Sequence, residues 1–141
     1  MTAEFWQPPW DTLCRKWSSA GYDTLTPDEK VWFNTRSLID SISNGGLISY
    51  YYNSGADTLD DCMLALDELG AAEVRAQVER VNALFGARVP EDLNERNAII
   101  DSWDEDSTEP VLADVDDRLD SMIPALEDAL NQFICRTGLA A

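Results

Sequence analysis

The stretch that decides the fold runs from Asp57 to Gly86 and reads DTLDDCMLALDELGAAEVRAQVERVNALFG. In its first half, apolar side chains recur with helical spacing, at Leu59, Cys62, Met63, Leu66 and Leu69. In its second half the same spacing is followed by Val74, Val78, Val81 and Phe85. Gly70 marks the end of the first helix. Because the break between the two helices is so short, we predict that they pack side by side as a hairpin.

Upstream of this hairpin, the segment Thr26-Pro27-Asp28-Glu29 carries a strong helix start signal. Thr26 can cap the helix, Pro27 suits its first position, and Glu29 can complete a capping box. The buried face of this helix is predicted to comprise Val31, Trp32, Thr35, Leu38, Ile39 and Ile42. An earlier helix, from Pro8-Pro9 to Gly21, is predicted to have an apolar face formed by Trp10, Leu13, Cys14 and Trp17.

Downstream of the hairpin, Pro90 is predicted to start a weaker helix, and the run from Asp104 to Pro110, which has no large apolar side chain, is predicted to be a loop. Two more helical patterns follow, with Pro124 expected to kink or restart the helix between them. They comprise Leu112, Val115, Leu119 and Met122, then Leu126, Ala129, Leu130, Phe133 and Ile134. No stretch alternates with period two. We therefore predict an all-α chain, a single compact multi-helix domain over residues 1–141 with short connections and no sheet.

The composition is strongly acidic. The 141 residues include 27 acidic and 10 basic side chains and no histidine, which gives a formal net charge of −17. Such a surface repels nucleic acid and anionic membranes and attracts basic partners. Direct binding to nucleic acid and a role at a membrane surface are therefore excluded. The N-terminus has no leader-like pattern, and no apolar run is long enough to span a membrane, so we expect a cytoplasmic protein.

The residue types that usually carry catalysis or hold a metal are scarce. Without histidine, His-dependent triads and His-containing metal sites are excluded. Cys14, Cys62 and Cys135 each fall within an apolar pattern, far from zinc-ligand spacing, and are predicted to be three reduced thiols in the core. The seven glycines form no phosphate-binding loop. The sequence therefore predicts a protein that is not an enzyme and that uses no cofactor or metal.

Two catalytic alternatives remain open. Paired carboxylates can hydrolyse glycosides, although among 27 acidic residues such pairs arise by chance. Residues 104–106 with Asp114, Asp116 and Asp117 could collect Ca²⁺ or Mg²⁺ through oxygen ligands. This stretch lacks the glycine and the glutamate of an EF-hand loop, because Glu109 and Val115 stand at those positions. A metal-dependent hydrolase is thus the third hypothesis for this chain.

The acidic side chains gather in two clusters, which we identify as candidate partner-binding residues. The larger cluster comprises Asp101, Asp104, Glu105, Asp106, Glu109, Asp114, Asp116, Asp117 and Asp120. The smaller begins with Asp57, Asp60 and Asp61. Like charges three or four positions apart destabilise a helix, so the chain tolerates some strain here. Three interpretations stay open: a solvated helix face, adaptation to high salt, or carboxylates that imitate the phosphates of a nucleic acid.

The most distinctive segment lies between two predicted helices and reads Asn44-Gly45-Gly46-Leu47-Ile48-Ser49-Tyr50-Tyr51-Tyr52-Asn53-Ser54-Gly55. Asn44 and the two glycines can end a helix with positive φ, and Tyr51 or Tyr52 is expected to pack inward. The chain here resembles the bacterial DNA-mimic protein 19-like family, over about Leu25 to Phe85. Members of that family share an Asn-Gly-Gly, an aromatic-rich stretch and an Asn-x-Gly. The motif residues, which we interpret as structural, are Asn44, Gly45, Gly46, Tyr51, Tyr52, Asn53 and Gly55.

The resemblance implies an acidic, all-helical protein that occupies the DNA-binding surface of a transcriptional regulator or nucleoid protein. It assigns no functional residue within the motif, so the candidate site rests on the charge clusters alone. Our leading hypothesis is therefore a DNA mimic that binds a basic DNA-binding protein. The alternative is an immunity or antitoxin-type protein that neutralises a basic protein. A homodimer is also open, since Trp6, Trp10 and Trp17 could form an interface, although we favour a lid over Trp32.

Overall fold

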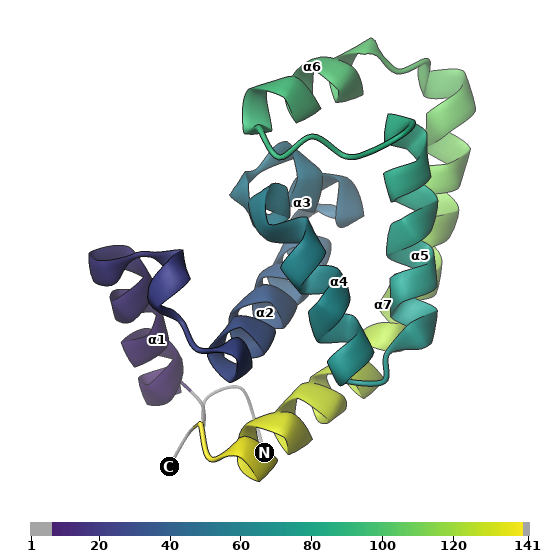
Figure 1. Ribbon diagram of the computed structural model, residues 1–141. Helices are drawn as coiled ribbons and strands as arrows, with labels where there is room; N and C mark the ends of the chain where they lie inside the picture. The colour runs from purple at the N-terminus through teal and green to yellow at the C-terminus, as the bar shows by residue number, and fades with distance from the viewer. Residues whose placement is uncertain (1–6, 140–141) are drawn as a thin grey trace.

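The computed structural model describes residues 7–139, and all regular structure in this range is helical (Figure 1). The all-α prediction is thus confirmed. The α-helices in this range are α1 (Gln7–Ala20), α2 (Pro27–Gly45), α3 (Leu47–Tyr52), α4 (Leu59–Glu68), α5 (Ala72–Asn82), α6 (Leu93–Ser102) and α7 (Glu105–Thr137). Short 3₁₀ helices connect some of them, at Tyr22–Thr24, Ser54–Thr58 and Ala83–Phe85.

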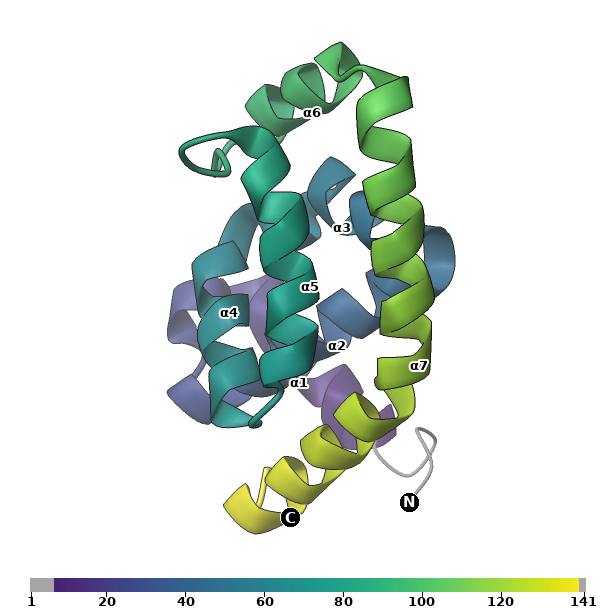
Figure 2. The same cartoon turned by 90° about the vertical axis from the view of Figure 1, so that its right-hand side faces the viewer.

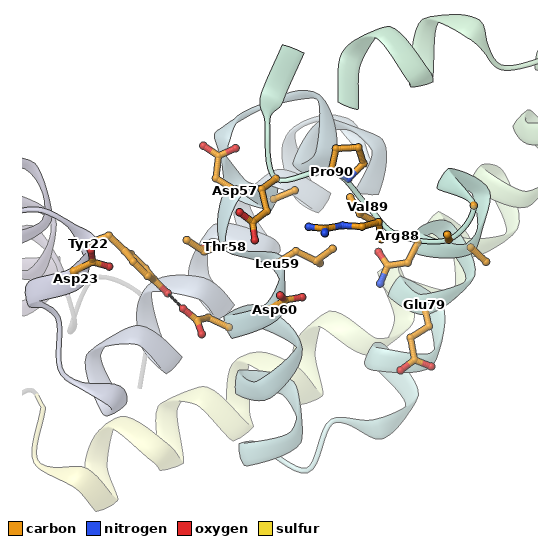
Figure 3. Close-up of a pocket in the computed structure, with 17 residues that line it drawn as sticks. Tyr22, Asp23, Asp57, Thr58, Leu59, Asp60, Glu79, Arg88, Val89 and Pro90 are labelled. Carbon is orange, nitrogen blue, oxygen red and sulfur yellow. Dashed lines mark hydrogen bonds between the residues drawn. The ribbon is translucent and has the colours of Figure 1, made fainter. Parts of the chain in front are cut away.

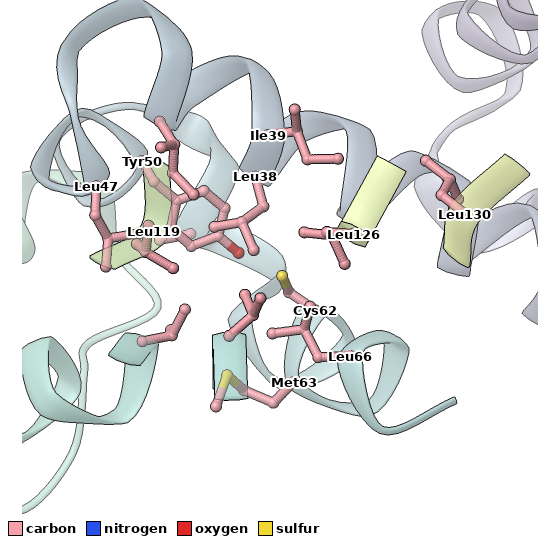
Figure 4. Packing of buried hydrophobic residues seen from close by; sticks show 14 of the residues in the cluster. Leu38, Ile39, Leu47, Tyr50, Cys62, Met63, Leu66, Leu119, Leu126 and Leu130 are labelled. Atoms are coloured by element: carbon pink, nitrogen blue, oxygen red, sulfur yellow. The ribbon is translucent and has the colours of Figure 1, made fainter. Parts of the chain in front are cut away.

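Helix α2 lies at the centre of the fold, where it packs against α3, α4 and α7. Helices α4 and α5 form the predicted hairpin, and α5 also packs along α7 (Figure 2). Helix α6 crosses the end of the molecule at which α5 finishes and α7 begins (Figure 2). The side chains that fill the space between these helices include Leu38, Ile39, Leu47, Tyr50, Cys62, Met63, Leu66, Leu119, Leu126 and Leu130 (Figure 4).

The helix signals found in the sequence act at their predicted positions. The Thr26 side chain accepts a hydrogen bond from the Glu29 N–H at 3.1 Å, and the Glu29 carboxylate accepts one from the Thr26 N–H at 2.8 Å. This is the reciprocal capping box. At the end of α4, Gly70 has a φ of +69°, and the Ala71 N–H donates to the Leu66 carbonyl at 2.9 Å. This glycine-dependent turn leads the chain directly into α5.

The aromatic residues of α1 cover the start of α2. The ring centroids of Trp10 and buried Trp32 lie 5.7 Å apart, and those of Trp17 and Phe33 lie 5.6 Å apart. Trp10 therefore packs over Trp32 as expected, whereas Trp17 packs on Phe33 and remains partly exposed. Trp6 lies outside the described residues.

The prediction of a loop from Asp104 to Pro110 was wrong, because α7 begins at Glu105. The Asp104 side chain caps this helix by accepting a hydrogen bond from the Asp106 N–H at 3.2 Å. Acidic residues in the first turn also suit the positive end of the helix dipole. Pro110 lacks the N–H that would bond to the Asp106 carbonyl, but Asp106 is exposed, so water can take that bond. This part of α7 is polar because most of its side chains face solvent, which hides its helical period.

The start of α6 differs from the prediction, and of the two effects expected of Pro124 only one occurs. Helix α6 begins at Leu93 rather than Pro90, with Asp92 accepting a hydrogen bond from the Glu95 N–H at 2.9 Å. Pro124 lies within a continuous α7 and does not restart it. The helix changes direction near its middle, as expected for a proline that removes a backbone hydrogen bond (Figure 2).

The three cysteines are free thiols, but the prediction that all three lie in the core was wrong. Cys62 is fully buried, Cys14 is half-buried and Cys135 is exposed. Cys135 follows the buried pair Phe133 and Ile134 on α7, so it turns away from the core. Burial raises the pKa of the Cys62 thiol to about 11, which disfavours the nucleophilic thiolate.

Candidate protein-binding surface

The first half of α7 carries most of the larger acidic cluster on one side. An α-helix advances by about 100° and 1.5 Å per residue. Glu105, Glu109, Asp116 and Asp120 therefore fall within an arc of about 60°, and Asp106 and Asp117 lie beside it. The buried residues Val115 and Leu119 fall outside that arc. We call the exposed members of this set the α7 acidic strip; they are Glu105, Asp106, Glu109, Asp117 and Asp120.

The α7 acidic strip is not neutralised by neighbouring side chains. Among residues 7–139, none of its five carboxylates takes part in an ion pair. From Glu105 to Asp120 the strip extends for about 22 Å along the helix axis. The helix fixes the positions of these charges, so little conformational entropy would be lost when a basic partner binds them.

Asp114 lies on another side of α7 and is neutralised. Arg80 of α5 donates to its Oδ2 at 2.7 Å, and Arg118 donates to the same atom at 2.9 Å. Hydrogen bonds from Arg80 and Arg118 lower the pKa of the Asp114 carboxyl. Asp114 therefore links α5 to α7 and contributes little free negative charge.

Asp116 has a structural role at the start of α3. Its Oδ1 accepts a hydrogen bond from the Leu47 N–H at 2.9 Å, across 69 positions of sequence. Gly46, with a φ of +79°, makes this approach possible, because a Cβ at that position would lie 2.6 Å from the Asp116 Oδ2. Asp116 thus acts as an N-cap supplied by another helix.

Asp101 and Asp104 flank the beginning of α7. The Tyr52 hydroxyl donates to Asp101 Oδ1 at 3.0 Å, and this hydrogen bond raises the pKa of the exposed tyrosine. Asp104 is the N-cap of α7 described above. Both carboxylates are exposed. They precede the α7 acidic strip in the sequence and extend the acidic region toward α6.

The smaller acidic cluster lines a cleft of about 960 Å³ at the start of α4 (Figure 3). One wall comes from Ser54–Thr58 and α4, and the opposite wall from the end of α5 and the loop 86–91. Arg88 extends from that loop toward Thr58 and Leu59 and makes no ion pair among residues 7–139 (Figure 3). We call this the acidic cleft; its carboxylates belong to Asp23, Asp57, Asp60, Asp61, Glu79 and Glu91.

Two of the predicted residues in the acidic cleft are held by contacts within the protein. Asp61 accepts a hydrogen bond from the Tyr22 hydroxyl at 2.6 Å, and Asn34 donates to that hydroxyl at 2.9 Å. Burial and the hydrogen bond to Asp61 raise the pKa of Tyr22. Asp57 forms an ion pair with Arg96 at 2.6 Å. Asp60 is exposed and makes no ion pair among the described residues.

Arg96 of α6 was missed in the sequence analysis, although its side chain is fully buried. Besides Asp57, it donates hydrogen bonds of 2.7–3.2 Å to the backbone carbonyls of Tyr51, Asn53, Pro90 and Glu91. Arg96 therefore joins the end of α3 to the loop 86–91 and supports two walls of the acidic cleft. The sequence offers one weak signal, because Arg96 is the only basic residue between Arg88 and Arg118.

The residues of the Asn-Gly-Gly motif make close contacts within the fold. Of its first three residues only Gly46 has positive φ, since Asn44 and Gly45 still belong to α2. A Cβ on Gly55 would lie 2.8 Å from the Tyr50 ring. The Asn53 side chain donates to the Ser49 carbonyl at 2.8 Å.

The three tyrosines of the motif have different environments. Tyr50 and Tyr51 are fully buried, and burial raises the pKa of each. The Tyr51 hydroxyl donates to the Asn82 side chain and to the Val78 carbonyl. Tyr52, one of the two candidates for inward packing, is 41% exposed instead. Its position at the end of α3 turns it toward α6, where it contacts Asp101.

No group of three or more cysteine or acidic side chains in residues 7–139 is placed to hold a metal ion, so the carboxylates at 104–106 and 114–117 do not converge. None of the helices in the same range combines the length and the apolar character needed to cross a membrane.

Comparison with known proteins identifies the family. No curated protein and no solved structure is significantly similar to this chain. A family model described as "DMP19-like protein" matches residues 23–137, which is most of the chain and extends the resemblance well beyond the Asn-Gly-Gly motif. The chain belongs to the DMP19-like protein family.

Proposed function

We propose that this protein is a non-enzymatic DNA mimic that binds the DNA-binding surface of a basic transcriptional regulator or nucleoid protein in the cytoplasm. The observation that carries the proposal is the α7 acidic strip, five exposed carboxylates on one side of a helix with no ion pair among the described residues. The net charge of −17 and the family match support the same conclusion. Binding of the partner to this protein would then exclude DNA.

Electrostatics explains how such a surface would compete with DNA. Carboxylates on successive turns of a helix lie about 5–6 Å apart, similar in scale to phosphates along a DNA strand. A basic groove would meet these charges in fixed positions on α7. Because the attraction is mainly between exposed charges, the complex should weaken steeply as the salt concentration rises.

The α7 acidic strip can be tested by neutralising three of its members, Glu109→Gln, Asp117→Asn and Asp120→Asn. Asp116 is left intact because it caps α3. The protein is immobilised, incubated with host lysate, and eluted first with salt and then with duplex DNA. We expect the immobilised protein to capture one basic DNA-binding protein, which duplex DNA then displaces. The triple variant should capture at most about a tenth of the amount that the unchanged protein captures.

A matched control removes the same amount of charge elsewhere, with Glu73→Gln, Glu95→Gln and Asp128→Asn. These three side chains are exposed and make no ion pair among residues 7–139. The control should keep most of the captured protein. Equal losses in the two triple variants would show that net charge matters and the position of the strip does not.

The acidic cleft favours a second candidate function, that of an immunity or antitoxin-type protein. A DNA backbone is convex, whereas this cleft of about 960 Å³ is concave and suits a basic protrusion of a partner. The same capture experiment separates the two functions. A partner of this second kind would bind despite excess DNA, and the Asp60→Asn variant would weaken its binding more than the α7 triple variant does.

A further inference from the structure

A second hollow lies between the beginning of α2 and the outer side of α4, apart from the α7 acidic strip. Its volume is about 400 Å³. Four of its eight lining residues are apolar, namely Pro27, Val31, Leu64 and Ala65. The other four are charged, namely Asp28, Lys30, Asp61 and Glu68. We call it the α2–α4 groove.

Leu64 distinguishes this groove from an ordinary polar surface. Its side chain is 63% exposed, compared with 43% for Trp17 and 41% for Tyr52. Its neighbours Met63 and Ala65 are buried against the core, so the apolar face of α4 is already covered without Leu64. An aliphatic side chain is thus exposed to water at the edge of a hollow that carboxylates also line.

The charges around the groove are mostly uncompensated. Asp28 and Glu68 are exposed and make no ion pair among residues 7–139. The Asp61 carboxylate accepts a hydrogen bond from the neutral Tyr22 hydroxyl at 2.6 Å and makes no ion pair within the described range. The Lys30 ammonium lies 4.9 Å from the centroid of the Tyr22 ring, so that cation is engaged with an aromatic face. The groove therefore combines an apolar surface with an acidic rim.

We propose that the α2–α4 groove docks an amphipathic α-helix with lysine or arginine residues beside its apolar face, supplied by a partner protein. Such a helix presents apolar side chains at i, i+3, i+4 and i+7 to Leu64 and Val31. Its flanking cations would reach Asp28 and Glu68 from either side. A second copy of this chain is a poor occupant, because its own surface is acidic and like charges across an interface oppose binding.

This inference stands independently of the proposed DNA mimicry. A row of carboxylates attracts every cationic surface, whereas an apolar anchor requires a matching shape. The groove would therefore give the protein a selective contact whether or not the α7 acidic strip imitates DNA.

The test compares two synthetic peptides of identical composition and charge. In one, leucines recur at i, i+3, i+4 and i+7 of a lysine-rich helix; in the other, the same residues are scrambled so that no apolar face forms. The dissociation constant of each is measured by fluorescence anisotropy with the full-length protein. We expect the amphipathic peptide to bind about tenfold more tightly than the scrambled one, as for a single well-packed apolar anchor.

The variant Leu64→Gln should reduce that affinity ratio to about one, since it removes the apolar anchor and leaves every charge in place. Leu64 is exposed and glutamine is a good helix former, so α4 should remain folded. Ala76→Gln, on the exposed side of α5, is the control and should keep the ratio. Asp117→Asn with Asp120→Asn should weaken both peptides equally and also keep the ratio, which separates this inference from the function of α7.

Three outcomes would overturn the proposal. Equal affinity for the two peptides would mean that charge alone attracts them. An unchanged ratio in Leu64→Gln would place the peptide elsewhere. A change in the oligomeric state of the free protein on Leu64→Gln, measured by light scattering, would identify a second copy of the chain as the occupant.

Discussion

Arg96 is the residue on which the segments around α3 converge. Its guanidinium binds four backbone carbonyls and the Asp57 carboxylate from a fully buried position. A planar group with five N–H donors can satisfy such a set, and lysine cannot. In a chain with 27 acidic residues, one of ten cations is thus used inside the protein.

Replacing Arg96 should destabilise the protein strongly. Arg96→Met is expected to lower the free energy of unfolding by about 3–5 kcal/mol, because buried carbonyls lose their donors. Asp57→Asn, which changes only the half-exposed partner, should cost about 1 kcal/mol or less. Urea denaturation followed by circular dichroism measures both. Similar losses for the two variants would mean that the exposed ion pair, and not the carbonyl contacts, is what matters.

Sequence reasoning could not identify Arg96, and the reason is physical. Its partners are mainly backbone carbonyls, which every residue carries, so no pattern of side chains in the sequence indicates where they lie. The same holds for Asp116 and Asp57, which stand in acidic runs indistinguishable from their neighbours. Only the folded chain shows that Asp117 faces solvent and Asp116 meets the Leu47 N–H.

At the scale of elements, α7 combines two tasks along its length. Its buried residues Val115 and Leu119 pack in the core, while the α7 acidic strip faces solvent. The sequence predicted the apolar positions of α7 and the bend at Pro124 well, because both depend on local periodicity and backbone chemistry. It missed the helix from Glu105 to Pro110 because a turn that buries little shows no apolar period.

Two adjacent aspartates of α7 allow a direct test of these tasks. Asp116→Ala should lower the free energy of unfolding by about 1 kcal/mol, because α3 loses an N-cap hydrogen bond. Asp117→Ala should change it by no more than about 0.5 kcal/mol, as is usual for an exposed site. Both can be measured by thermal or urea denaturation. If the two variants behave alike, the capping role of Asp116 is refuted.

At the scale of the whole molecule, charge repulsion opposes the compact state. A net charge of −17 is spread over a surface of 7727 Å², and most carboxylates of residues 7–139 take part in no ion pair within that range. The fold persists because buried apolar side chains from α1 to α5 and from α7 form one continuous core. The composition predicted this acidity, but not which carboxylates remain free, since pairing depends on contacts distant in sequence.

Salt should therefore stabilise the isolated protein. Between about 10 mM and 150 mM NaCl the Debye length falls from about 30 Å to about 8 Å, which screens most of the repulsion. We expect Tm, measured by calorimetry, to rise by a few degrees over this interval and to level off above it. The strip triple variant should show a smaller rise. A Tm that continues to climb at molar salt would favour adaptation to high salt as the origin of the acidity.

The position of α3 has a consequence for how such chains diverge. This six-residue helix is too short to persist alone, and its two ends are held by Asp116 and Arg96, far along the chain. The Asp116 carboxylate lies so close to position 46 that no residue with a Cβ fits there without displacing it. Positions 46 and 116 should therefore covary among relatives, and so should positions 57 and 96. The conformation of this short segment between two helices therefore depends partly on residues in the last third of the sequence.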